Sequence, residues 1–103
     1  MPGIDGIMED PVLGILRELM STVTRDYRIV HVDIRRGDDE IRIQFRLRPL
    51  IEGATISLWR LLSLEEKIMR KLSFEATFSH TRIGLSEDGD IIVLYVYRRI
   101  TYK

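Results

Sequence analysis

The chain has 103 residues, of which 45% are hydrophobic and 31% are charged, and its 16 basic residues equal its 16 acidic ones. This length and hydrophobic content predict one folded domain, and the balanced charge argues against a protein that coats nucleic acid through net charge alone. Because there is no cysteine, disulfides, thiolate catalysis and cysteine-based zinc sites are excluded.

The amino-terminal part predicts a flexible segment followed by a helix. Residues 1–9 contain two glycines and a proline and show little periodicity. Asp10 can accept the free N–H groups at a helix start, and Pro11 suits the first helical position. Apolar residues at helical spacing then continue the helix to about Arg25. Residues 10–103 are expected to form a single α+β domain.

Two strands that pair as a hairpin are predicted next. Residues 27–36 and 40–49 both alternate between apolar and polar side chains, which is the period of a strand. Gly37-Asp38-Asp39 has the composition of the turn between them. In the second strand Ile41, Ile43, Phe45 and Leu47 alternate with Arg42, Gln44, Arg46 and Arg48. That strand therefore has one apolar face and one basic face.

A second helix follows over residues 57–72. Its apolar stripe favours one continuous element, with room for a kink, although the Ser63-to-Glu66 spacing of a capping box would also allow a start at Leu64. Ser57 marks the first position of the predicted element.

The last two strands are predicted at residues 74–83 and 91–102, joined by a turn at Asp88-Gly89. The final strand is apolar on both faces through Tyr97. That pattern indicates an interior strand, or one whose outer face is covered by a partner.

The element order is a duplicated αββ unit, which predicts a two-layer α+β sandwich: a four-stranded antiparallel sheet with two helices on one face. The other face is then open. By alternation it takes His31, Asp33, Arg35, Arg42, Gln44, Arg46, Arg48, Glu75, Thr77, Ser79 and Thr81. From the last strand we assign Ile91, Val93, Tyr95, Tyr97 and Arg99 to it, because the alternative set of Ile92, Leu94 and Val96 has no polar atoms to expose.

This positive, tyrosine-containing face permits three interpretations. Tyrosine and arginine are enriched in protein interfaces, so two open sheets could meet in a homodimer. Arginines also bind phosphates and tyrosines stack on unpaired bases, which favours nucleic acid. The third interpretation is a solvated surface. We expect a small non-enzymatic interaction or assembly protein that self-associates through this face, with nucleic-acid binding as the alternative. The candidate binding residues are Arg42, Gln44, Arg46, Arg48, Tyr95, Tyr97 and Arg99.

Trp59 stands at the edge of the second helix's apolar stripe. Such a residue either closes the edge of its own core or anchors a protein partner. Both interpretations stay open at this point.

Known catalytic and metal-binding patterns are missing from the sequence. His31 and His80 are the only histidines, without the spacing of a helical zinc site, and no phosphate-binding glycine loop or G-x-S-x-G motif occurs. We therefore expect no catalytic residue, no metal and no cofactor.

The αββαββ order resembles the core of LAGLIDADG homing endonucleases, whose strands place polar side chains in the DNA major groove. The resemblance implies a metal-binding acid at a helix end, which is where Asp26 stands. The stretch MSTVTRDYRI has no glycine beside Asp26, however, and MRKLSFEATF has no acid before Glu75. A metal-dependent nuclease around Asp26 is accordingly the third and least favoured function.

The composition also bears on the protein's environment. No apolar run approaches the roughly 20 residues of a membrane span, and no signal-peptide layout opens the chain, so we expect a soluble cytoplasmic protein that does not bind membranes. Asparagine is absent and Gln44 is the single glutamine. This composition, with its many charges, favours a thermophilic source, archaeal or viral, although a GC-rich genome would also favour arginine.

Overall fold

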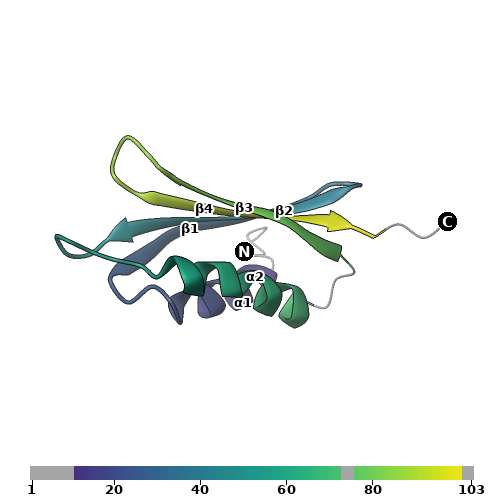
Figure 1. The fold of residues 1–103 in the computed structure, drawn as a ribbon, viewed down its shortest axis with the longest axis horizontal. Coiled ribbons are helices and arrows are strands. Elements are labelled where there is room, and N and C mark those ends of the chain that lie inside the picture. Colours follow the sequence, from purple (N-terminus) through teal and green to yellow (C-terminus); the bar gives the residue numbers. More distant parts are fainter. Residues whose placement is uncertain (1–10, 73–75, 101–103) are drawn as a thin grey trace, which may run out of the picture.

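The computed structural model describes residues 11–72 and 76–100, which form two helices packed on one face of an antiparallel sheet (Figure 1). The helices are α1 (Pro11–Ser21) and α2 (Leu58–Leu72); the strands are β1 (Tyr27–Arg36), β2 (Glu40–Pro49), β3 (Ala76–Leu85) and β4 (Ile91–Arg99). The sheet order is β1-β2-β4-β3, so β1 and β3 are the edges. The predicted α+β class, with two helices and an antiparallel sheet, is confirmed. No described helix is long and apolar enough to cross a membrane.

Helix α1 ends at Ser21, before the predicted end at Arg25. The hydroxyl of Thr22 donates to the Leu19 carbonyl at 2.7 Å, and that of Thr24 donates to the Met20 carbonyl at 3.1 Å. Hydroxyls that bind the last carbonyls in this way compete with continued helical bonding. The predicted flexible segment 1–9 and the predicted cap Asp10 lie outside the described residues.

Helix α2 is continuous from Leu58 to Leu72. The Ser57 side-chain oxygen accepts a bond from the Arg60 N–H at 3.3 Å, which satisfies a free donor of the first turn. The hydroxyl of Ser63 donates to the Arg60 carbonyl at 3.0 Å, so it lies within the helix and does not begin one. The second start that we considered at Leu64 is therefore not used.

The core lies between the helices and one face of the sheet, and the orientation of β4 differs from our prediction. Tyr95 and Tyr97 are fully buried, and their hydroxyls each donate a 2.6 Å hydrogen bond to α2, to the carbonyls of Leu61 and Glu65 respectively. The Tyr95 ring also meets Phe45 edge to face, with centroids 6.1 Å apart. Burial raises the pKa of both tyrosines far above the usual value, so the hydroxyls remain protonated donors.

The assignment of Ile91, Val93, Tyr95, Tyr97 and Arg99 to the open face was therefore wrong. Polar side-chain tips favour the open side of a sheet, but the backbone of a covering helix can satisfy a tyrosine hydroxyl inside the core. The opposite set of β4 residues faces outward: Ile92, Leu94, Val96 and Arg98.

Both edge strands contain a β-bulge, one between Ile29 and His31 and one between Phe78 and His80. On β1 the residues after the bulge keep the predicted outward side, since His31, Asp33 and Arg35 lie opposite Arg46, Gln44 and Arg42.

On β3 the bulge changes the prediction. Thr77 is exposed as expected, but Thr81 pairs with the buried Tyr95 and faces inward, where its hydroxyl has no hydrogen-bond partner among the described residues. His80 and Arg82 take the outward positions in its place. The predicted outward residue Glu75 lies outside the described part of the chain.

The buried hydroxyl of Tyr95 provides a test of this orientation. Replacing Tyr95 with Phe removes the bond to Leu61 and should lower the free energy of unfolding by about 0.5–1.5 kcal/mol. Urea unfolding followed by circular dichroism measures the change. An unchanged free energy of unfolding would contradict the inward placement of Tyr95.

Candidate functional site

The side of the sheet opposite the helices, here called the open sheet face, carries a surplus of positive charge. The register places seven arginines on it: Arg28, Arg35, Arg42, Arg46, Arg48, Arg82 and Arg98. Four carboxylates accompany them: Asp33, Glu40, Asp90 and Asp88, the last within 3.6 Å of Arg46. Although the whole chain is neutral, this face is therefore basic.

An apolar ridge runs through the middle of the open sheet face along β4. It consists of Ile92, Leu94 and Val96, which lie opposite Arg46, Gln44 and Arg42 of β2. Val96 is only 3% exposed although it faces away from the helices, so side chains on the open face cover it. Leu94 contributes to a shallow hollow together with Asp33, Arg35, Arg42 and Gln44. The face thus combines an apolar centre with charged flanks.

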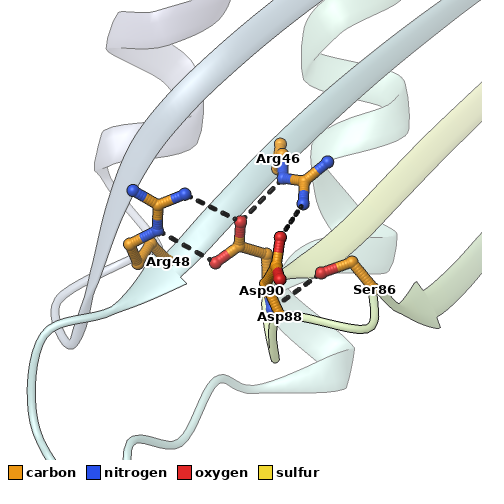
Figure 2. A network of polar contacts seen from close by, with 5 residues as sticks. All are labelled: Arg46, Arg48, Ser86, Asp88 and Asp90. Carbon is orange, nitrogen blue, oxygen red and sulfur yellow. Dashed lines mark hydrogen bonds and ion pairs between the residues drawn. The ribbon is translucent and has the colours of Figure 1, made fainter.

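A buried carboxylate organises one end of this face. Asp90 is 1% exposed and receives bonds from two arginines of β2 (Figure 2). Its Oδ2 accepts from Arg46 Nε at 2.7 Å and from Arg48 Nη2 at 3.1 Å, and its Oδ1 accepts from Arg48 Nε at 3.1 Å. The Arg48 pair is bidentate, which is the strongest geometry for an arginine and a carboxylate.

The turn before β4 holds Asp90 in place. The Asp90 N–H donates to Ser86 Oγ at 3.0 Å, and the Ser86 N–H donates to the Asp90 carbonyl at 2.8 Å. Gly89 adopts φ 87°, a left-handed conformation that favours glycine, so the predicted turn at Asp88-Gly89 is present. The turn between β3 and β4 is thereby connected to β2 by ion pairs, in addition to the hydrogen bonds between β2 and β4 in the sheet.

The electrostatics of the network have two consequences. Hydrogen bonds from Arg48 and Arg46 lower the pKa of Asp90 from 3.8 to about 2, so this carboxyl is ionised at neutral pH. Asp90 also fixes both guanidinium groups in one orientation. A guanidinium has five N–H donors, and the contacts within the described residues leave some of these donors on each arginine unengaged. Such oriented donors suit a phosphate or another anion.

Two arginine pairs stand directly opposite each other across β1 and β2: Arg28 with Arg48, and Arg35 with Arg42. Like charges in this arrangement are destabilising. Asp33 lies 3.2 Å from Arg35 Nε, and Glu40 pairs with Arg42, which reduces the repulsion in the second pair. In the first pair Asp90 offsets the charge of Arg48, but Arg28 has no such carboxylate among the described residues, so this pair keeps an excess of positive charge.

The structure brings together only part of the predicted site. Arg42, Gln44, Arg46 and Arg48 share the open sheet face as expected, whereas Tyr95 and Tyr97 lie in the core and Arg99 is on the helix side of the sheet.

The members of the open sheet face that the sequence analysis missed include Arg28, Arg82, Arg98 and Asp90. Unbroken alternation assigns Arg28 and Arg82 to the inward side, and the bulges reverse this. An arginine at an inward position was thus itself a sign of a bulge. Arg98 and Asp90 were missed because the orientation of β4 was wrong.

Trp59 lies on α2 with 78% of its surface exposed, so it does not close the edge of the core. It borders a small hollow together with Leu62, Ser63, Glu65 and Glu66. Its role as a protein anchor stays a prediction.

The link between Asp90 and its arginines predicts a specific acid sensitivity. Because the folded-state pKa of Asp90 is depressed, the ionised carboxylate stabilises the fold above about pH 4, and this contribution is lost as the pH falls from 3.8 toward 2. An Asp90→Asn variant should unfold at lower urea concentration than wild type at pH 7, and the difference should disappear near pH 2. Asp88→Asn is the matched control, since Asp88 is largely exposed and should change stability little. Equal behaviour of the two variants would contradict this account.

Asp26 lies between the end of α1 and the start of β1. The Asp26 carboxylate accepts a bond from the Thr55 N–H at 3.3 Å, and the Asp26 carbonyl accepts from the Leu50 N–H at 2.9 Å, so this residue fastens the connector that precedes α2. Within residues 11–72 and 76–100 no group of three acidic or histidine side chains could hold a metal ion.

No protein-family model, no curated protein and no solved structure matches the chain.

Proposed function

We propose that this chain is a non-enzymatic nucleic-acid-binding protein and that the open sheet face is its contact surface. The observation that carries the proposal is the concentration of seven arginines on one face of a chain with no net charge. Arg28 and Arg48 stand directly opposite each other, and the ion pair of Arg48 with Asp90 offsets only part of the repulsion between them. An anionic partner relieves that repulsion, and a nucleic-acid backbone supplies a row of such charges.

Phosphate contact is the mode of binding that this face supports. Arg46 and Arg48 are already oriented by Asp90, so less side-chain freedom is lost when they bind a phosphate. Tyr95 and Tyr97 lie in the core and are not available to stack on bases. Contacts to phosphates position a protein on nucleic acid without reading its sequence, so we expect weak sequence preference.

Self-association through the same face is the second candidate, and the apolar ridge on β4 favours it. Ile92 and Leu94 are only half-buried, and an apolar centre with a charged rim is typical of protein interfaces. Two such faces would, however, bring two arginine surpluses together, and like charges across an interface oppose association. We therefore rank this function below nucleic-acid binding.

A salt-titrated binding assay with single- and double-stranded DNA and RNA tests the first candidate. Affinity should fall linearly on a log–log plot against salt, because each phosphate contact releases counterions. Arg28→Ala should weaken binding to every sequence and reduce the slope by about 1. The matched control is Arg17→Ala, since Arg17 is an exposed arginine of α1 on the other side of the molecule.

The outcomes separate the two candidates. Salt-dependent binding that weakens in Arg28→Ala but not in Arg17→Ala supports the nucleic-acid function. If the protein bound none of the four nucleic acids at low salt, that function would be rejected. Light scattering can then exclude the second candidate, since a monomer of 12.1 kDa at all concentrations rules out self-association through any face.

We also propose that the αββ order is a duplicated unit. In each half the second strand lies in the centre of the sheet and the first lies at an edge, so the order reads alike from either edge. Phe45 of β2 and Tyr95 of β4 occupy matching inward positions in the two halves, and their rings are in contact. The two central strands pair with each other, as related halves would around a two-fold axis.

A thermophilic source is a further proposal, supported by composition and by the linked ion pairs of Arg46, Arg48, Asp88 and Asp90. Networks of this kind contribute more to stability at high temperature, because the free-energy cost of desolvating charges falls. We expect a thermal unfolding midpoint of about 80 °C or more, measured by calorimetry. A midpoint in the mesophilic range of about 45–65 °C would count against a thermophilic source.

A further inference from the structure

We propose that the edge strand β3 pairs with β3 of a second copy of this chain, joining two sheets into one and burying the exposed flank of α2 in the same contact. This surface is separate from the open sheet face. It uses the edge of the sheet and the apolar side chains on the helix side of that edge.

The helix side of β3 is apolar and poorly covered. Ile83 and Leu85 lie on that side by register, yet they are 44% and 77% exposed. Three apolar residues of α2 are also exposed: Leu58, Trp59 and Leu62. Helix α2 packs against β3, so the exposed apolar side chains of both elements lie on the same side of the sheet. An apolar patch of this kind marks an interaction surface.

The exposed flank of α2 is the one that faces away from α1. Helix α2 packs against α1 and against β3, while α1 packs on β1, so α2 lies between α1 and the β3 edge. Leu58 and Leu62 are four residues apart and share one flank of the helix. Leu64, on the opposite flank, is fully buried. The flank carrying Leu58 and Leu62 is therefore open toward the side on which a partner of β3 would lie.

The spacing of strands and helices fits such a junction. Neighbouring strands lie about 4.8 Å apart, so four strands occupy about 19 Å. Two packed helices, at 8–10 Å each, occupy about the same width. When a second sheet continues the first at β3, the two copies of α2 accordingly come to lie about one helix diameter apart. Sheet and helix layers then both continue without a gap.

The apolar area is close to what a stable dimer needs. Trp59 contributes on the order of 200 Å² and the five exposed side chains together on the order of 600 Å² per copy, given their exposed fractions. A standard interface buries about 800 Å² per partner. The edge of β3, whose outward N–H and C=O groups would pair between the copies, supplies much of the remainder.

The other sheet edge has no comparable surface. Ile29 and Ile34 on the helix side of β1 are packed against the core. None of the large exposed apolar residues of the described chain lies on α1 or β1. Among the edges that the structure describes, β3 is therefore the one with apolar side chains left to cover.

In the proposed contact the two-fold axis lies at Ile83. A two-fold axis through Ile83 places Thr81 opposite Leu85 of the second copy, and Arg82 opposite Gly84. This pairing stays clear of the bulge before His80. An axis through Arg82 would instead set the two Arg82 side chains directly against each other, which is unfavourable.

Single cysteines test this register in a chain that has no cysteine of its own. In Ile83→Cys the two sulfurs meet at the axis, so mild oxidation should yield a disulfide-linked dimer. Arg82→Cys and Gly84→Cys place the sulfurs apart and should not cross-link. Leu50→Cys is the control for random collision, because Leu50 is more exposed than Ile83, at 60% against 44%, but lies outside this surface. Cross-linking at 82, 84 or 50 with none at 83 would overturn the proposal.

The oligomeric state gives an independent readout without nucleic acid. Wild type should sediment as a dimer at micromolar concentration, and Leu85→Glu should weaken the dimer at least tenfold, whereas Leu50→Glu should not. Trp59 is the single tryptophan, so its fluorescence should change with dilution in wild type and not in Leu85→Glu. Circular dichroism checks that each variant is folded. A wild type that is monomeric at every concentration, or a dimer unaffected by Leu85→Glu, would refute the β3 contact.

Discussion

The hydrogen bonds from Tyr95 and Tyr97 to the backbone of α2 determine which face of β4 lies inside the protein. This strand is apolar on both faces, so hydrophobicity alone does not select its orientation. A tyrosine ring fills the space beneath a helix, and its hydroxyl finds an acceptor in the helix backbone. Because side chains of a strand alternate strictly, this choice also places the ridge of Ile92, Leu94 and Val96 outside, beside the arginines of β2.

Asp90 adds an electrostatic connection to this arrangement. It comes from the second half of the chain and binds Arg46 and Arg48 from the first half. A buried carboxylate is costly unless its oxygens are paired, so these two arginines are held firmly. The same contacts fix the orientation of both guanidinium groups on the open sheet face. The two arginines thus stabilise the fold and also place positive charge on the open sheet face. The charge of this face therefore depends on the buried Asp90 as well as on the exposed acids.

Much of the fold could be predicted because its patterns are local. Alternation in residues 40–49 was sufficient to place Arg42, Arg46 and Arg48 together, and turn composition located both hairpins. The orientation of β4 could not be predicted, since it depends on hydrogen bonds to a helix distant in the chain. The bulges were missed for a different reason. An extra residue reverses the alternation of a strand, and the only sign of this in the sequence is that unbroken alternation would place Arg28 and Arg82 on the inward side. Asp90, the ion-pair partner of Arg46 and Arg48, was not recognised because it belongs to a stretch with the composition of a turn.

The two proposed surfaces are compatible because of the symmetry of antiparallel pairing. When two edge strands pair about a two-fold axis, that axis stands perpendicular to the sheet, so both helix layers lie on one side and both open sheet faces lie on the other. Pairing at β3 would therefore place the two sets of arginines on one continuous surface of twice the width. A polyanion lying across that surface would contact both copies, and binding one copy would raise the effective concentration of the other. The apolar edge and the basic face would then serve one arrangement, in which self-association extends the surface proposed to bind nucleic acid.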